Sequence, residues 1–491
     1  MNPKPTITLK SGVYLFIIIS TFKITEASYQ AYLTRCSNPD RSIGVLAISS
    51  GDTFSYTGAM ENYIQTGTYF FDNGKERVYA GRMPYYSLPY LLFRNFFNLA
   101  AAYDAVVIFQ VVIESLAILY FGLTLLMLGC SKITYWIGVL LLIFSYNFSH
   151  SSNYISPESL TSSLILIFIY TYLSYVNKKN NTNLFVLGLM IALLACLKAY
   201  MVLLFIPVGV QFLIEEIKEP NMINSLRRVV SRTAIVSIPL VVVLTPWIIR
   251  NYGVYKKFVP LQITTTAGYS YTEADFAYRK FVQAWGGDII FWEKSAAGCY
   301  FIPTPEIHCE FKFPTYVFTD KYGIEEIKNV RDKYVKLQGS FSPVLEEQVV
   351  SEFNNLTSIY KKERPFRYYL LTPLILAKRF IVNSGSYYLP IHSSNPCYHP
   401  IQLLLKIWTS GLYWVTLTFG VIGAFYLLNR EPETWVVVSI PIIVIILFPI
   451  FLRSIEWRMF EPLFSEFLLL SLIFFDAIYH RRRITHKNPF V

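Results

Sequence analysis

The sequence predicts an all-α polytopic membrane protein with about ten transmembrane helices and two large extracytoplasmic loop regions. Of its 491 residues, 54% are hydrophobic and 17% are aromatic, which is more apolar than a soluble domain usually is. Several apolar runs also approach the roughly 20 residues that a helix needs to cross a bilayer. Short basic segments separate these runs, as expected for loops between membrane helices.

The predicted spans follow one another along the chain. We interpret residues 12–22, extended through 25–33, as the first span, because no small-residue cleavage site of a signal peptide follows them. The run 184–214 is long enough for two short spans, which we expect to break near Lys198. The other predicted spans are 105–128, 133–149, 160–176, 234–249, 403–428, 435–451 and 464–478.

The positions of the basic residues predict the orientation, since cationic loops stay in the cytoplasm. With Lys4 and Lys10 inside, the alternation of spans leaves about 35–103 and 250–400 outside. We therefore divide the chain into an N-terminal membrane module (1–251) whose first outer loop is about 35–103, an extracytoplasmic region (252–400), and C-terminal helices with a basic tail (401–491). The net charge of +11 comes largely from cytoplasmic anchors and does not indicate a nucleic-acid partner.

Four of the six cysteines fall outside the membrane in this topology, where disulfides can persist. Cys299 and Cys309 bracket a short loop and could be bridged, while Cys36 and Cys397 complete the set. The alternative is that all four are unpaired. No Cys/His pattern indicates a metal site.

Acidic and basic side chains gather on the outer side of the predicted membrane protein. Asp52 follows a glycine at the start of an expected amphipathic helix (54–65), and Glu158 begins the outer end of the span 160–176. A carboxylate can accept a proton from an acceptor hydroxyl, and cations can hold a departing lipid phosphate. The candidate phosphate-binding cations are Arg82, Lys198, Arg250 and Arg458.

Each of these residues also has a purely structural interpretation. Asp52 could act only as a helix N-cap, and Glu158 could pair with Lys198 within the fold. Arg250 and Arg458 could extend to lipid headgroups. We expect no required cofactor or metal, although Asp52 and Glu158 could share a divalent cation.

Four segments are distinctive: Gly51-Asp52 with Ser55, Tyr56 and Ala59; 81–86 (GRMPYY); 245–252 (TPWIIRNY) with 258–260; and Arg458 with Pro462. They resemble motifs of the GT-C superfamily of polytopic glycosyltransferases, which use lipid-phosphosugar donors. This superfamily includes protein O-mannosyltransferases and the aminoarabinose transferases that modify lipid A. Three departures from the motifs are an Asp52 without an acidic neighbour, Tyr85 where Gly is usual and Ser87 where Pro is usual. A Trp-Trp-Asp signature is absent from the sequence, which argues against an oligosaccharyltransferase.

The resemblance implies an inverting transfer on the outer face, with Asp52 in the catalytic position and Glu158 near a second acidic site. The expected partners are a polyprenyl-phosphate donor that carries a hexose, the lipid bilayer, and a glycan, lipid or protein acceptor. We favour surface polysaccharide such as O-antigen as the acceptor. The expected location is a bacterial inner membrane with the active site facing the periplasm.

Two other functions stay open at the level of sequence. One is an O-antigen polymerase or ligase, which would depend on arginine-rich outer loops. The other is a non-enzymatic transporter of lipid-linked glycans, which would line a central path with charges. We expect the charges to cluster at the ends of the spans instead.

Overall fold

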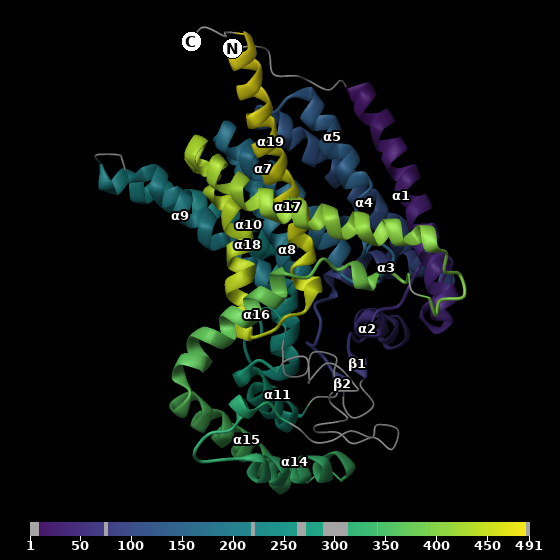
Figure 1. Cartoon of the computed structure of the whole chain (residues 1–491), viewed down its shortest axis with the longest axis vertical. Helices are drawn as coiled ribbons and strands as arrows, with labels where there is room; N and C mark the ends of the chain where they lie inside the picture. The colour runs from purple at the N-terminus through teal and green to yellow at the C-terminus, as the bar shows by residue number, and fades with distance from the viewer. Residues whose placement is uncertain are drawn as a thin grey trace. The chain divides into compact units, whose positions relative to one another are not determined.

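The computed structural model describes residues 9–72, 77–217, 221–262, 272–287, 313–340, 342–391 and 393–487. Over these residues the regular secondary structure is helical apart from two short paired strands, β1 (Phe71–Asp72) and β2 (Arg77–Val78). The strands pair antiparallel, with Phe71 opposite Val78. The predicted all-α class is therefore confirmed (Figure 1).

Among the described residues, seven helical segments are long and apolar enough to cross a membrane, by length and composition. Two shorter apolar helices, α5 (Lys132–Ile143) and α8 (Asn181–Leu197), and the charged helix α1 (Leu9–Ser37) account for the other predicted spans. Nine of the ten predicted spans thus fall on one helical segment each of an integral membrane protein, whereas the span predicted over 133–149 is divided between α5 and the short helix α6 (Tyr146–Ser149). The seven segments are Leu99–Met127, Glu158–Asn177, Ala199–Glu216, Met222–Tyr255, Pro400–Arg430, Pro432–Leu452 and Trp457–His480.

The predicted break near Lys198 is confirmed. Helix α8 ends at Leu197, a 3₁₀ segment covers Ala199–Leu204, and α9 covers Phe205–Glu216. Lys198 itself has extended backbone angles (φ −136°, ψ 103°). The lysine therefore sits between two helices rather than within one.

The chain divides into two compact units, which are described separately below. The first unit comprises Met1–Ile263, Ser384–Pro441 and Glu461–Val491. The second unit comprises Thr264–Asn383 and Ile442–Phe460. The apolar segment Pro432–Leu452 begins in the first unit and ends in the second.

Helices of the first unit pack side by side (Figure 1). Helix α4 (Leu99–Met127) contacts α1, α5 and α7 (Glu158–Asn177), while α8 lies between α7 and α10 (Met222–Tyr255). Glycines permit the closest approaches, since they have no Cβ. Gly188 of α8 meets the backbone of Val236 on α10, and Gly423 of α17 (Leu403–Arg430) meets Leu470 of α19 (Phe464–Lys487).

The first outer loop of the predicted topology (about 35–103) folds onto α4. Its helix α2 (Thr53–Thr66) confirms the helix predicted for 54–65, and a 3₁₀ turn (Pro84–Ser87) leads into α3 (Leu88–Arg94). Aromatic side chains of these elements, including Tyr56, Tyr86 and Tyr90, form one core with Tyr103 of α4. This core fixes the start of α2, where Asp52 lies.

The second unit contains α11 (Glu273–Trp285), α14 (Ile324–Gly339), α15 (Pro343–Glu363), α16 (Thr372–Ile381) and the end of α18 (Trp435–Ile445). The helical periodicity of the sequence over 325–337 and 344–360 predicts a helix in each range, and α14 and α15 confirm both. Arg453 donates to the carbonyls of Gln283 (3.3 Å) and Ala284 (2.9 Å) in the last turn of α11. Because carbonyls in the last turn of a helix lack the N–H partner that interior carbonyls have, Arg453 has a structural role at the end of α11.

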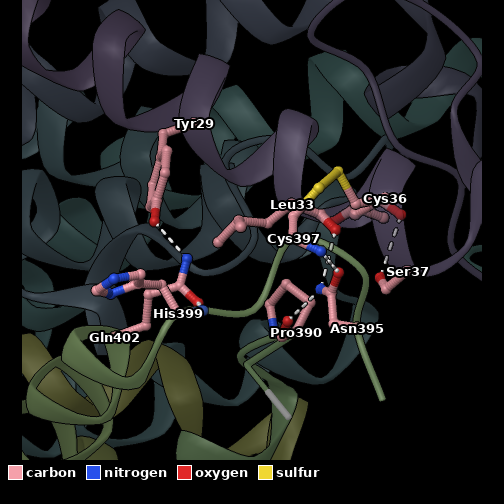
Figure 2. The surroundings of a disulfide bond; sticks show 10 residues. Tyr29, Leu33, Cys36, Ser37, Pro390, Asn395, Cys397, His399 and Gln402 are labelled. Atoms are coloured by element: carbon pink, nitrogen blue, oxygen red, sulfur yellow. Dashed lines mark hydrogen bonds between the residues drawn. A yellow bond between two sulfur atoms is a disulfide. The ribbon is translucent and has the colours of Figure 1, made fainter. Parts of the chain in front are cut away.

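A disulfide joins Cys36 at the end of α1 to Cys397, 361 residues away in the chain (Figure 2). Nearby, Gln402 donates to the Tyr29 hydroxyl over 2.8 Å, and Asn395 donates to the carbonyl of Leu33 over 3.4 Å. The alternative in which all four outer cysteines are unpaired is therefore wrong. The bridge considered between residues 299 and 309 lies outside the described residues.

Candidate functional site

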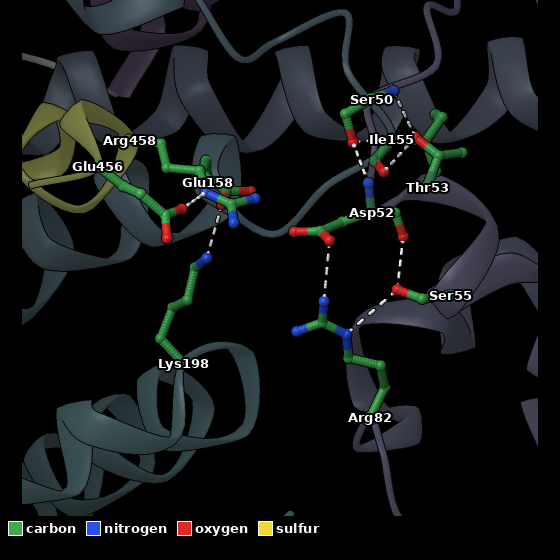
Figure 3. A network of polar contacts seen from close by, with 10 residues as sticks. All are labelled: Ser50, Asp52, Thr53, Ser55, Arg82, Ile155, Glu158, Lys198, Glu456 and Arg458. Carbon is green, nitrogen blue, oxygen red and sulfur yellow. Dashed lines mark hydrogen bonds and ion pairs between the residues drawn. The ribbon is translucent and has the colours of Figure 1, made fainter. Parts of the chain in front are cut away.

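Asp52 occupies the residue before α2, but its side chain makes no capping hydrogen bond. It accepts instead from Nη2 of Arg82 over 3.0 Å, and Nε of Arg82 donates to the Ser55 hydroxyl over 3.1 Å (Figure 3). The side chains of Asp52 and Arg82 are only 8% and 12% exposed. The interpretation of Asp52 as no more than a helix cap is therefore wrong, since its carboxylate forms a largely buried ion pair.

Two tyrosines connect this ion pair to the interior of the first unit. The Arg82 guanidinium lies 4.8 Å from the centre of the Tyr56 ring, which meets the Tyr86 ring edge to face at 5.1 Å. The Tyr86 hydroxyl donates to Oε1 of Gln110 over 2.9 Å. Burial and then the nearby charge of Glu158 raise the pKa of Tyr86 well above its ordinary value, so its hydroxyl stays protonated.

Glu158 is the first residue of α7, where the unpaired N–H groups and the helix dipole favour an acid. Its Oε1 accepts from Nζ of Lys198 over 2.7 Å, and the two side chains are 4% and 10% exposed. The predicted pairing of Glu158 with Lys198 is therefore confirmed. Three residues earlier, the Ile155 carbonyl accepts from the Thr53 hydroxyl over 3.1 Å (Figure 3). This bond ties the loop before Glu158 to the residue after Asp52.

Arg250 of α10 is held by oxygens of neutral groups. It donates to the carbonyls of Tyr69 and Tyr79 and, over 2.8 Å, to Oδ1 of Asn251. Its guanidinium lies 5.0 Å from the centre of the Trp247 ring. Within the described part of the chain no carboxylate pairs with Arg250, so its positive charge is not neutralised there.

Arg250 borders a mainly apolar cavity of about 320 Å³ between α10 and the first outer loop. The hydroxyl of Tyr69 is buried and has no hydrogen-bond partner among the described residues. Burial raises the pKa of Tyr69 above its ordinary range and that of Tyr85 to about 12, so both hydroxyls remain donors. The cavity is lined by Met60, Tyr63, Tyr69, Pro84, Tyr85, Leu88, Leu91, Val243, Pro246, Trp247 and Arg250.

Arg458 belongs to the second unit, where its Nε donates to Oε2 of Glu456 over 2.6 Å (Figure 3). The arginine side chain is 33% exposed. Its predicted role beside the residues of the first unit stays a prediction.

Sequence reasoning missed a buried charge cluster in the first unit. Nζ of Lys23 lies 2.8 Å from Glu26 and 3.2 Å from Glu114, and it also donates to the Ser149 hydroxyl. Glu114 accepts in turn from the Ser152 hydroxyl. The available signals were a carboxylate inside the predicted span 105–128 and a Lys/Glu pair three residues apart on one helix.

This cluster corrects the expectation that charges lie only at the ends of the spans. Lys23 and Glu114 are 1% and 2% exposed in their side chains, so they are sealed from solvent. Gln110 adds hydrogen bonds to the carbonyls of Ser152 (2.9 Å) and Tyr154 (3.1 Å). Together these contacts fix the loop that precedes Glu158.

His150 lies in the same loop, and its Nδ1 is 2.7 Å from the Tyr146 hydroxyl. Burial lowers the pKa of His150 to about 4, so the imidazole is neutral near neutral pH. Among the described residues, no group of three His, Cys, Asp or Glu side chains is arranged to hold a metal ion.

Comparison with known proteins found no matching family model and no matching curated relative. Two solved structures from Archaeoglobus fulgidus are similar, each with a TM-score of 0.48. One is the oligosaccharyltransferase AglB in complex with an inhibitory peptide and a dolichol-phosphate, with 12% identity over 97% of this chain and 52% of that chain. The other is an oligosaccharyltransferase tethered to an acceptor peptide, with 11% identity over 96% and 50%. The chain spans about half the length of these structures.

Proposed function

We propose that the protein is an inverting glycosyltransferase that moves a hexose from a polyprenyl-phosphate donor to an extracytoplasmic acceptor, with surface polysaccharide such as O-antigen as the favoured acceptor. The observation on which this proposal rests is the largely buried pair of Asp52 and Arg82 at the start of α2. A carboxylate used only as a cap would not need a guanidinium that is itself positioned by Ser55.

In the proposed reaction the Asp52 carboxylate accepts the proton of the acceptor hydroxyl. The hydroxyl oxygen then attacks the anomeric carbon from the side opposite the phosphate. The carbon–oxygen bond to the phosphate breaks, and the lipid phosphate leaves with the bonding electron pair. One displacement inverts the anomeric configuration, so a second, nucleophilic carboxylate is not required.

Arg250 and its cavity fit the donor phosphate and the first part of its lipid. The guanidinium supplies a charge that no described carboxylate neutralises, and a guanidinium can bind a phosphate through two parallel hydrogen bonds. Tyr69 also lines this cavity, and its buried hydroxyl has no hydrogen-bond partner among the described residues. The apolar lining suits an isoprenoid chain because it buries hydrocarbon without leaving polar groups unpaired.

Two other candidate cations, Arg82 and Lys198, are less available to bind the donor phosphate. Arg82 already pairs with Asp52, and Lys198 already pairs with Glu158. We propose that Arg82 stabilises the carboxylate of Asp52 and that Glu158 with Lys198 forms the second acidic site, which holds the outer ends of α7 and α8 in place. Arg250 is then the principal phosphate-binding cation.

The test is transfer of radiolabelled sugar from a polyprenyl-phosphate hexose by purified protein in proteoliposomes. Asp52→Asn keeps an oxygen that can accept from Arg82, so it should fold and bind donor yet lose nearly all turnover. Arg250→Ala should raise the KM for donor, with partial recovery in Arg250→Lys. The matched control is Asp40→Asn. Asp40 is an exposed carboxylate in the same loop as Asp52, so this variant should retain full activity.

The same assay separates the alternatives. Near wild-type transfer by Asp52→Asn would contradict a base at this position. Polymerisation of lipid-linked repeats would then favour a polymerase or ligase, and movement of intact lipid-linked glycan without transfer would favour a transporter. Offering lipopolysaccharide, lipid A and peptide as separate acceptors identifies the acceptor class.

A further inference from the structure

Helix α16 of the second unit and the π-helical turn before it (Arg367–Leu371) have one buried side and one exposed apolar side. Leu376 and Phe380 face the interior and are fully buried. Four apolar side chains on the other side are open to the surroundings, at spacings close to one helical turn. This exposed face consists of Phe366 (67% exposed), Tyr369 (67%), Leu370 (49%) and Leu374 (56%).

The exposed face continues onto a candidate membrane span. Phe380 of α16 stacks on Phe448 at 6.2 Å and meets Phe460 edge to face at 5.3 Å. Phe448 lies in the last part of Pro432–Leu452, whose mean hydropathy of 2.9 is the highest of the seven candidate spans. The same part exposes Ile446, at 42%, and Phe451, at 73%. Because a spanning segment meets lipid on its exposed side, lipid also reaches the neighbouring α16.

Charges are distributed accordingly over the second unit. Its helices α14 and α15 carry surface ion pairs, such as Lys328 with Glu325 and Lys333 with Glu352. The exposed face of α16 instead ends in Lys378, which is exposed like its neighbour Arg379. Cations that border an apolar helix face suit the anionic headgroups of a bilayer.

We propose that the second unit docks on the surface of the lipid bilayer through the exposed face of α16. Phe366, Leu370 and Leu374 enter the boundary between headgroups and acyl chains, and Lys378 contacts lipid phosphates. An apolar face of this kind is unusual on a surface that meets only water. Docking would also hold Phe460, and with it the neighbouring Arg458, near the depth of the headgroups.

The experiment uses the full-length protein in proteoliposomes with an environment-sensitive fluorescent amino acid at position 370. Lipids brominated near the start of the acyl chain should quench this fluorophore several-fold more than water-soluble iodide does. The matched control carries the fluorophore at Asp332 of α14, whose side chain is 69% exposed. Iodide should quench that position, and brominated lipid should not.

A substitution within the exposed face provides a second test, with the fluorophore still at position 370. Leu374→Glu places a carboxylate in the exposed face and should reduce lipid quenching at position 370, while Glu347→Gln on α15, an exposed polar change, should not. Protection of position 370 from both quenchers would show that protein covers the face. Quenching by iodide alone would show that the face meets water. Either result would overturn the proposal.

Discussion

Lys198 donates a hydrogen bond to Glu158 over 2.7 Å, although 40 residues separate them. One residue follows α8 and the other begins α7, so the pair joins the ends of two neighbouring helices. A buried ion pair of this kind contributes little net stability compared with apolar side chains. Loss of one partner is different, because it leaves an unpaired charge in a low-dielectric interior.

Lys198→Met should therefore destabilise the protein strongly, by about 3–5 kcal/mol. The double variant Lys198→Met/Glu158→Gln removes both charges and should recover most of that loss. Thermal unfolding in detergent, followed by tryptophan fluorescence, measures both. If the single and double variants unfold at the same temperature, the two side chains do not form the pair seen here.

Features of the fold that depend only on neighbouring residues could be predicted from the sequence. The helix over 54–65 and the break at Lys198 follow from helical periodicity and from run lengths, which depend on neighbouring residues only. The pairing of Asp52 with Arg82 was not foreseen as such, but both residues were selected because they lie in the same predicted outer loop.

Contacts between distant segments could not be read in this way. The bond between Cys36 and Cys397 depends on how α1 and α17 are placed, and four outer cysteines allow three pairings. The cluster of Lys23 with Glu114 was missed because an acid inside an apolar run was counted as part of a span. Such an intramembrane carboxylate is itself a signal for a buried cationic partner.

His150 should make the stability of the protein sensitive to acid. Its pKa is about 4 in the folded protein and about 6.5 in an unfolded chain. Between these values the unfolded state binds more protons than the folded state. The contribution of His150 to the free energy of unfolding is therefore greatest above pH 6.5 and decreases as the pH falls toward 4. The total loss is about 3 kcal/mol.

Chemical denaturation at a series of pH values tests this. His150→Gln should remove most of the acid-dependent loss, because glutamine does not titrate. His399→Gln, at an exposed histidine, is the control and should keep it. An unchanged pH profile in His150→Gln would show that other groups cause the loss.

The disulfide between Cys36 and Cys397 should contribute about 2–5 kcal/mol, since it closes a very long loop in the unfolded chain. The double variant Cys36→Ser/Cys397→Ser should unfold at a lower temperature than the wild type. Reductant should lower the unfolding temperature of the wild type toward that of the variant. If neither reductant nor the double substitution lowers the unfolding temperature, the bond is absent or energetically neutral.

The packing of α17 on α19 depends on Gly423. A Cβ atom added there would collide with the backbone carbonyl of Leu470, which cannot rotate away as a side chain could. Gly423→Ala should therefore destabilise the protein by about 1–3 kcal/mol through overpacking.

Gly411 of the same helix has no atom within 4 Å of the added carbon. Gly411→Ala should be neutral or slightly stabilising, because alanine favours a helix interior more than glycine does. Thermal unfolding of both variants in the same detergent measures the difference. Equal unfolding temperatures would mean that α17 and α19 are farther apart than the structure places them.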